Sequence, residues 1–284
     1  LGHHLKHRIR TDSSQAREND KVIVEIVSYP RRNDMYAQGA IIQVLGRAGH
    51  YDTEINAIIA QYGLPYEIPE ACRQQAHLAA QDYNPDTAAD RDDISGDVII
   101  TIDPPDAKDF DDAISLRKDS EGNWVLGVHI ADVATFIPLN SPLDQEARLR
   151  GNSIYLPGRV IPMLPEVLSN GICSLQPGQK RFAKSVYIHY DPQGKILGTE
   201  FANSIICSRA RLTYEQADHI LKGKAEGFPG EVTALLKDME ILARAIEARR
   251  DKNGMIHLDL PETELVLDKS GRVVDAHPDR KSVV

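Results

Sequence analysis

Four aspartates lie at the end of, and just after, a run of apolar residues that predicts a buried strand. The run is residues 97–103, and the aspartates are Asp103, Asp109, Asp111 and Asp112. Ionised carboxylates this close in the chain repel one another, and at the end of an apolar strand they need cations to neutralise them. Carboxylate oxygens are the ligands that Mg²⁺ prefers, and Mn²⁺ accepts them too. The stretch therefore indicates a divalent-metal site suited to phosphodiester cleavage.

Spacing alone leaves other interpretations of this stretch open. It is compatible with a solvated acidic loop or a Ca²⁺ loop, although the EF-hand pattern fails because its sixth position is not glycine and its twelfth is not glutamate. The triplet Asp109-Phe110-Asp111 also has the form of the acidic Asp-x-Asp that some nucleotide-sugar transferases use with Mg²⁺ or Mn²⁺.

Composition narrows the class of protein. The chain has 284 residues, of which 42% are apolar and 26% charged, which is typical of a folded globular protein and argues against wholesale disorder. No apolar run is long enough to cross a membrane, so we expect no membrane partner. The three cysteines are far apart in the sequence, which disfavours a disulfide framework or a zinc site and indicates a cytoplasmic location.

Charge is unevenly distributed along the chain. The net charge of −9 speaks against nonspecific nucleic-acid binding. Residues 51–112 are strongly acidic, however, whereas residues 142–190 carry more lysine and arginine than aspartate and glutamate. This asymmetry favours a metal-dependent site beside a phosphate-binding surface.

The first third of the chain predicts a small β unit followed by helices. Residues 22–27 and 40–45 are β-branched runs, and two strands alone are not stable in water, so they must belong to a small barrel or sheet. Helices are predicted at 53–62, with Thr53 as the N-cap, and at 69–82. A polar linker then leads into a new domain.

The rest of the chain predicts a mixed α/β domain. A second strand covers 124–130, and a helix begins after Ser141 and ends near Gly151. Thr213 opens a capping box, and residues 231–250 predict a long amphipathic helix. Within these elements we interpret Trp124 and His129 as core side chains.

Several blocks of the sequence resemble the RNase II/RNase R (RNB domain) family of 3′→5′ exoribonucleases. They are Thr-Ile-Asp-Pro-Pro-Asp-Ala-Lys-Asp-Phe-Asp-Asp-Ala at 101–113, Gly-Val-His-Ile-Ala-Asp-Val at 127–133, Arg-Gly-Asn-Ser-Ile-Tyr-Leu-Pro-Gly-Arg at 150–159 and Leu-Ser-Asn-Gly-Ile-Cys-Ser-Leu at 168–175. The blocks occur in the family's order and spacing, and the first has the form of the RNase R branch. Residues 21–48 resemble the end of the family's cold-shock barrel.

The resemblance implies an α+β fold in which the end of an OB-type cold-shock β-barrel precedes the first half of an RNB-type mixed α/β catalytic domain. The implied divisions are a partial cold-shock domain at 1–50, a helical connector at 51–90 and the RNB domain at 91–284. Because the family's enzymes are longer, we expect this chain to be a fragment truncated at both ends, and the full-length protein to be monomeric.

The resemblance also implies roles for individual residues. Asp111 would be essential for cleavage and largely dispensable for RNA binding, while Asp103, Asp109 and Asp112 would hold Mg²⁺, with Mn²⁺ as the alternative metal. Tyr155 would clamp the 3′-terminal nucleotide of single-stranded RNA, although an arbitrary tyrosine is more often a core residue. The candidate phosphate contacts are Arg150, Arg159 and Arg181, with Arg148, Lys180 and Lys184 as further cations.

The implied activity is processive hydrolysis of single-stranded RNA from its 3′ end to nucleoside 5′-monophosphates. The family's second half supplies an arginine and a glutamate near the scissile phosphate, so we expect this fragment alone to be inactive. The alternative is a catalytically silent RNA-binding relative of the same fold. Four intact, mutually repelling aspartates weigh against that alternative, and a nucleotide-sugar transferase does not account for the block around Tyr155.

Overall fold

The computed structural model describes residues 9–10, 16–29, 36–257, 263–268 and 273–278. The chain divides into two compact units. The first comprises Leu1–Ile68, Asn152–Pro162 and Asp259–Val284, and the second comprises Pro69–Gly151 and Met163–Leu258. Within the described residues, none of the helices has both the length and the apolar character needed to cross a bilayer.

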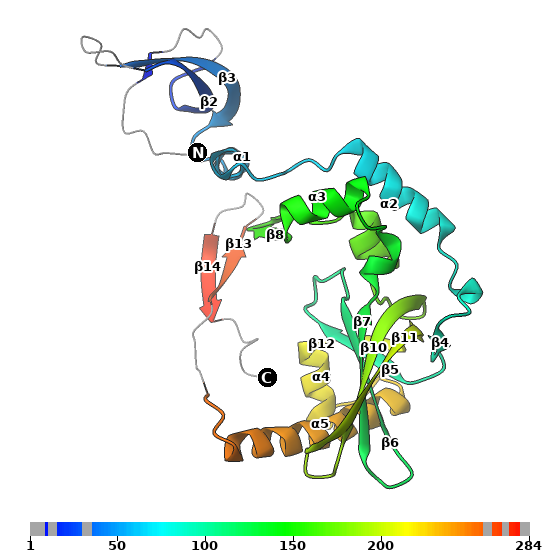
Figure 1. Ribbon diagram of the computed structural model, residues 1–284. Coiled ribbons are helices and arrows are strands. Elements are labelled where there is room, and N and C mark those ends of the chain that lie inside the picture. Colours follow the sequence, from blue (N-terminus) through cyan, green and yellow to red (C-terminus); the bar gives the residue numbers. More distant parts are fainter. Residues whose placement is uncertain (1–8, 11–15, 30–35, 258–262, 269–272, 279–284) are drawn as a thin grey trace. The chain divides into compact units, whose positions relative to one another are not determined.

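The first unit contains a three-stranded sheet in the order β1-β3-β2 (Figure 1). The strands are β1 (Ile9–Arg10), β2 (Asp20–Ser28) and β3 (Ala37–Arg47). β2 is antiparallel to β3, and β1 is parallel to it. The strands predicted at 22–27 and 40–45 are confirmed within β2 and β3. Two hairpins complete the unit: β8 (Ile154–Leu156) with β9 (Arg159–Ile161), and β13 (Thr263–Leu267) with β14 (Val273–Pro278).

Helix α1 (Tyr51–Tyr62) follows the sheet and begins earlier than the sequence predicts. The N-cap position is His50, which makes no side-chain cap, so the prediction that Thr53 caps the helix is wrong. Thr53 is instead buried inside the helix, where its side chain packs rather than accepting a hydrogen bond from a free N–H group. Gly63 ends the helix with a φ of 60°, a conformation that glycine adopts without strain.

The second unit is built on a seven-stranded mixed sheet in the order β12-β5-β6-β7-β10-β11-β4. Its strands are β4 (Asp92–Asp93), β5 (Ile99–Asp103), β6 (Asp112–Lys118), β7 (Trp124–Ala131), β10 (Lys180–Tyr190), β11 (Ile196–Cys207) and β12 (Ala210–Thr213). The four central pairs, from β5 to β11, are antiparallel. The two outer pairs, β12 with β5 and β11 with β4, are parallel.

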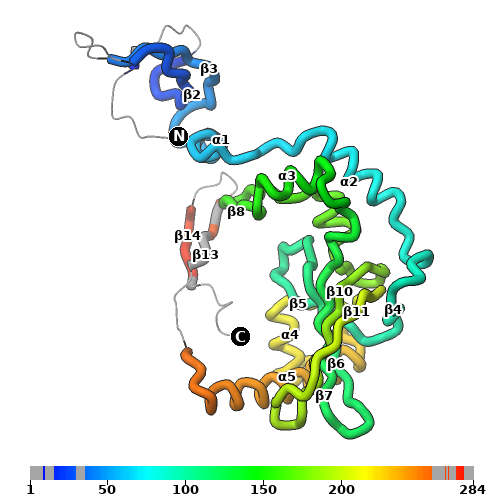
Figure 2. Tube along the Cα trace, in the orientation of Figure 1, coloured from blue at the N-terminus to red at the C-terminus, as the bar shows by residue number. Residues whose placement is uncertain are grey.

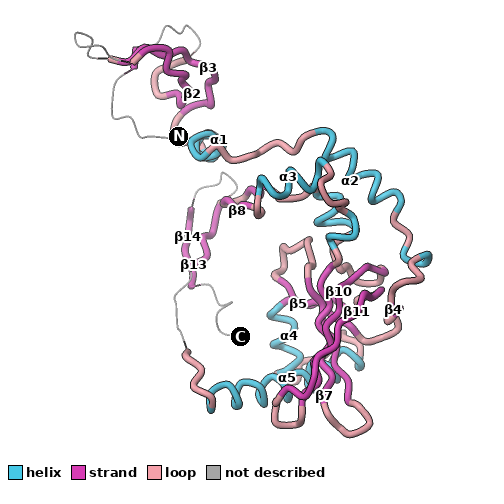
Figure 3. The backbone as a smooth tube through the Cα atoms, in the orientation of Figure 1, coloured by secondary structure: helices cyan, strands magenta, loops and turns pink. Residues whose placement is uncertain are grey.

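Helices α4 (Tyr214–Leu221) and α5 (Gly230–Lys252) of this unit lie along the sheet, whereas α2 (Glu70–Asp82) and α3 (Pro142–Arg150) lie beside each other away from it (Figures 2 and 3). The unit also contains the shorter helical segments η1 (Pro85–Thr87), η2 (Val133–Phe136) and η3 (Val167–Ile172). The predicted capping box at Thr213 and Gln216 is confirmed, and so is the Ser141 cap of α3. The side chain of Gln75 in α2 reaches α3, donating to Ser141 Oγ at 2.9 Å.

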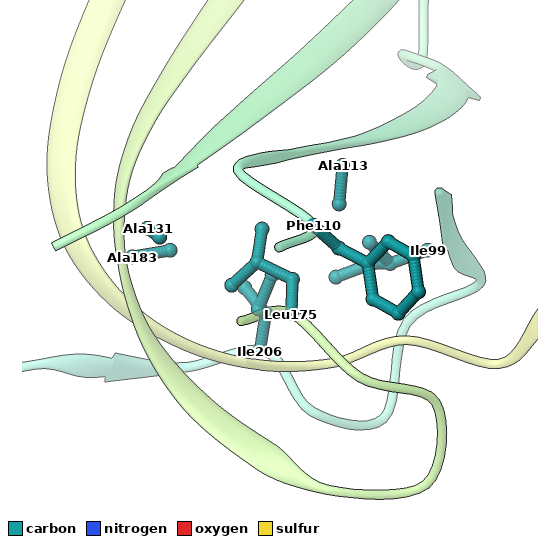
Figure 4. Close-up of a cluster of buried hydrophobic side chains, with 7 residues drawn as sticks. All are labelled: Ile99, Phe110, Ala113, Ala131, Leu175, Ala183 and Ile206. Carbon is teal, nitrogen blue, oxygen red and sulfur yellow. The ribbon is translucent and has the colours of Figure 1, made fainter. Parts of the chain in front are cut away.

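Strand β5 is buried on both faces, which explains its unbroken apolar run. On one face Ile100 packs with residues of α4 and α5, including Ile220 and Leu235. On the other face Ile99 belongs to a buried cluster shown in Figure 4, whose other members are Phe110, Ala113, Ala131, Leu175, Ala183 and Ile206. The strand that leads to Asp103 is therefore anchored by two hydrophobic layers.

His129 is a fully buried polar side chain at the centre of the sheet. Its Nε2 lies 3.0 Å from Ser115 Oγ on β6, and its Nδ1 lies 2.7 Å from Ser185 Oγ on β10. Gly127 leaves the space for this arrangement, because a Cβ there would collide with Ser115 Oγ and His129 Nε2. Burial lowers the pKa of His129 to about 4. The prediction of a satisfied core histidine is confirmed, and so is that of a core Trp124.

The pKa of His129 predicts a pH-dependent loss of stability. The unfolded chain takes up the proton below about pH 6.5, whereas the folded chain resists protonation down to about pH 4. The stabilisation is therefore complete above the unfolded pKa and declines as the pH falls through that window, by roughly 2–3 kcal/mol. Chemical denaturation of His129→Gln between pH 7 and 4 should show a shallower decline than the unsubstituted chain. The exposed His219→Gln serves as the control, and equal slopes in all three proteins would contradict the assignment.

Candidate active site: the acidic loop

The four predicted aspartates lie on one connection of the second unit. β5 ends at Asp103 and β6 begins at Asp112, and we call residues 103–112 the acidic loop. The ladder between these two strands pairs only Ile99 with Ser115 and Ile100 with Ile114. Beyond Ile100 the two segments separate, so the loop opens at the end of a strand that is fixed by the core.

Burial and neighbouring negative charges raise the pKa of two carboxyl groups in the acidic loop, those of Asp103 and Asp111. Burial raises the pKa of Asp103, and the negative charges of Asp112 and Asp111 raise it further, while the nearby Thr101 hydroxyl and the positive charge of Arg211 oppose the rise. The pKa of Asp111 is raised by partial withdrawal of its carboxylate from water and by the charges of Asp109 and Asp112. The four groups are thus close enough to repel one another, although Asp111 and Asp112 are exposed and Asp103 and Asp109 half-buried.

One feature of the Asp103 side chain fits a bound cation. Its Oδ2 atom is buried and has no hydrogen-bond partner among the described residues. A buried carboxylate oxygen without a donor fits a positively charged ligand, and the donor set of the loop is the oxygen-rich type that hard divalent cations accept. Within the described ranges, however, no group of three Asp, Glu, His or Cys side chains is arranged to hold a metal ion. The assignment of Asp103, Asp109 and Asp112 as metal ligands stays a prediction.

Arg211 on β12 supports the start of the acidic loop. Its Nη2 donates to the carbonyl oxygens of Pro104 at 2.6 Å and Pro105 at 2.8 Å, and its guanidinium lies 5.4 Å from the centre of the Phe110 ring. The residue pairs with Thr101 across the parallel ladder between β12 and β5. Sequence reasoning missed Arg211, since nothing in its local sequence shows that β12 lies beside β5.

Tyr155 is not a core residue. It lies in β8 of the first unit and is 70% exposed. An exposed ring can stack on a base or ribose, and the clamp role of Tyr155 stays a prediction.

The three arginines predicted to contact RNA make contacts with the protein itself. Arg150 in α3 is buried, and its Nε donates to Glu146 Oε1 at 2.8 Å. In the first unit, Arg159 donates to Asn56 Oδ1 at 2.9 Å and to Asp52 Oδ1 at 3.0 Å. Buried Arg181 on β10 donates to backbone carbonyls, including that of Ser174 at 2.9 Å. RNA contact by these arginines stays a prediction.

The other candidate cations are more exposed. Lys180 Nζ contacts Asp86 Oδ1 at 2.8 Å and Asp93 Oδ2 at 3.2 Å. Lys184 Nζ donates to Asn203 Oδ1 at 2.6 Å, and Arg148 pairs with Asp144 at 3.2 Å. The surface pair of Arg148 with Asp144 can exchange with other anions, since exposed ion pairs contribute about 0–1 kcal/mol each.

Comparison with known proteins assigns the family. Residues 91–284 match the RNB domain family, and residues 4–69 match the cold shock domain family. The chain belongs to the RNB domain family. Ribonuclease R of Thermotoga maritima is 37% identical over 275 residues, which cover 94% of this chain and 38% of that relative. This RNB chain therefore spans well under half the length of that curated relative.

Solved structures agree with this assignment. Mycoplasma genitalium RNase R in complex with ribose-methylated single-stranded RNA matches with a TM-score of 0.87 and 33% identity, over 96% of this chain and 43% of that one. The same enzyme in complex with double-stranded RNA matches with a TM-score of 0.88 and 32% identity, over 98% of this chain and 50% of that one. The predicted fold, an OB-type cold-shock domain followed by a mixed α/β RNB domain, is confirmed. The predicted boundaries near residues 50 and 90 stay predictions.

Repulsion in the acidic loop predicts that removing one charge stabilises the RNB chain when no divalent cation is supplied. Asp103→Asn should raise the free energy of unfolding by about 1 kcal/mol at pH 7 in EDTA, or roughly 2–4 °C in the melting temperature. Because the pKa of Asp103 is raised, its charged form is disfavoured in the folded state, and removing that charge should stabilise the fold. The gain in unfolding free energy should shrink as the pH falls through that pKa, since the carboxyl group is then protonated. Exposed Asp106→Asn is the matched control. A lower melting temperature for Asp103→Asn than for the control would contradict this account.

Proposed function

We propose that this chain is the aspartate-bearing part of an enzyme that hydrolyses RNA from the 3′ end. The observation that supports it is that residues 91–284 match the RNB domain family and carry four aspartates in one open loop, where the neighbouring aspartate charges help to raise the pKa of Asp103 and Asp111. The Thermotoga relative is named ribonuclease R, and the Mycoplasma relative is described in complexes with RNA. The proposal extends these properties to the full-length protein that contains this chain.

The proposed chemistry is hydrolysis of the terminal phosphodiester to release nucleoside 5′-monophosphates processively. Asp103, Asp109 and Asp112 would hold Mg²⁺, which supplies charge stabilisation for the attacking and leaving oxygens of a phosphodiester. Asp103 is suited to this by its buried, unpartnered Oδ2. Asp111, at the exposed end of the loop, would act at the scissile phosphate rather than in holding the RNA.

Substrate binding is assigned to groups other than the aspartates. A tyrosine ring stacked on a base contributes about 1–3 kcal/mol and tolerates any sequence, which suits an enzyme that removes successive nucleotides. Exposed Tyr155 is the proposed ring, and Lys184 and Arg148 are exposed cations that can meet phosphates. We propose that the isolated chain is inactive, because it spans well under half the length of its Thermotoga relative and the family's arginine and glutamate are expected in the remainder.

The decisive substitution is Asp111→Asn in the full-length protein. We expect it to lower the rate of Mg²⁺-dependent decay of single-stranded RNA by at least about 100-fold, because it removes a charge needed at the reacting phosphate. RNA affinity should stay within about threefold, since binding rests on stacking and phosphate contacts. Product release from a 3′-labelled oligonucleotide measures the rate, and filter binding in Ca²⁺ measures affinity. An equal loss of affinity and rate would overturn the assigned role, and a wild-type protein that binds RNA without Mg²⁺-stimulated decay would favour a silent RNA-binding relative.

Tyr155→Ala tests the clamp separately from the chemistry. With less stacking at the 3′ end, short products should dissociate earlier, so the end products should become longer by a few nucleotides, while the initial rate on long RNA changes little. Denaturing gels of a 5′-labelled substrate resolve the lengths, and Tyr155→Phe, which keeps the ring, is the matched control. Identical product ladders for all three proteins would contradict the clamp.

A further inference from the structure

Ser174 lies against the acidic loop from a distant part of the sequence. It follows η3 in the segment that continues to Leu175, and it is fully buried. Its hydroxyl donates to the carbonyl oxygen of Lys108 at 2.7 Å and accepts from the N–H of Phe110 at 3.1 Å. The hydroxyl thus bridges the backbone on both sides of Asp109, and it uses its single proton and a lone pair in doing so.

Leu175 extends the same attachment by one residue. Its N–H donates to the carbonyl oxygen of Phe110 at 2.9 Å. The side chains of Leu175 and Phe110 belong to the buried cluster of Figure 4, so the attachment combines backbone hydrogen bonds with apolar packing. Directly after it, the carbonyl of Asp111 accepts from the N–H of Ala131 on β7 at 2.9 Å. The backbone is therefore held at Lys108, Phe110 and Asp111, on both sides of Asp109.

Ser174 is itself held in place by hydrogen bonding to Arg181. The guanidinium Nε of Arg181 donates to the carbonyl oxygen of Ser174 at 2.9 Å, and another of its nitrogens donates to the carbonyl oxygen of Lys180 at 3.0 Å. Arg181 is on β10, a central strand of the sheet. A continuous set of hydrogen bonds thus leads from the rigid sheet through Arg181 and Ser174 to the backbone that carries Asp109 and Asp111.

We propose that Ser174 is a positioning residue that fixes the orientation of Asp109 and Asp111 for the reaction, an inference that rests on the proposed function. Carboxylates that repel one another spread apart unless their backbone is constrained, and a hydroxyl bridging the residues on either side of Asp109 supplies that constraint. A misplacement of about 1 Å at a catalytic group can lower a rate about 100-fold. Ser174 touches neither RNA nor metal in this role and acts only through the loop.

The experiment compares Ser174→Ala with Ser208→Ala in the full-length protein. Ser208 is the matched control, because it is also buried and its hydroxyl donates to a backbone carbonyl, that of Ala210 at 3.1 Å, which is not one of residues 103–112. Both substitutions leave a half-buried backbone carbonyl without its donor, and Ser174→Ala also leaves the buried N–H of Phe110 without its acceptor, so both should lower the melting temperature. Ser174→Cys, which keeps a weaker donor and acceptor, tests rescue.

For Ser174→Ala we expect kcat to fall about 10- to 100-fold with KM for RNA within about threefold, and the Mg²⁺ concentration for half-maximal rate to rise. Ser174→Cys should recover part of kcat, and Ser208→Ala should keep kcat within about twofold of wild type. Hydrogen exchange of the peptide covering residues 108–112 should accelerate in Ser174→Ala alone.

Two results of the activity measurements would overturn the inference. One is a kcat for Ser174→Ala within about twofold of wild type, and the other is an equal fall in Ser208→Ala, which would make the loss a consequence of stability. Unchanged exchange at residues 108–112 in Ser174→Ala would also overturn it, whatever the activity. A wild-type protein without Mg²⁺-dependent decay would instead overturn the proposed function, and the exchange measurement distinguishes that failure from the failure of the positioning role.

Discussion

The aspartates of the acidic loop repel one another, and packing in the second unit must oppose this repulsion to keep the loop in one conformation. Burial and neighbouring charges raise the pKa of Asp103. The pKa of Asp111 is raised in the same way, by burial and by the charges of Asp109 and Asp112. Repulsion between neighbouring carboxylates does not by itself favour any one conformation of the loop. Its shape comes from its surroundings: β5 enters it from a core packed on both faces, and Ser174 fixes its centre.

Arginine side chains hold several of the segments around the acidic loop. They donate hydrogen bonds to backbone carbonyls as well as to carboxylates. Arg211 holds Pro104 and Pro105, and Arg181 holds Ser174. Arg91 pairs with Asp132 at 2.6 Å in a buried site and stacks 4.2 Å from the Phe182 ring. Planar guanidinium groups suit these positions because they offer several donors in fixed directions. A basic segment of sequence therefore marks structural cations as well as candidate contacts for RNA.

The elements themselves were largely predictable. Local signals predict β2, β3, α3, α4 and α5, since apolar periodicity, the Ser141 cap of α3 and the Thr213 capping box of α4 act over a few residues. The start of α1 was missed, because His50 supplies no side-chain cap that the sequence could show. The grouping of β8 and β9 with the first unit was not foreseen either, because it depends on contacts such as those of Arg159 with Asp52 and Asn56.

The sequence alone determined the family and the identity of the candidate site, because four aspartates after a buried strand, together with the blocks that follow them, form a local and ordered pattern. Tertiary structure decided which side chains support that site. Ser174 and Arg211 are distant from the acidic loop in sequence and become its neighbours only through the order of strands in the sheet. It also decided that Arg150 and Arg181 are buried and that Tyr155 is exposed. Residue type gives charge and shape, whereas burial and partners follow from packing among segments that the sequence does not place together.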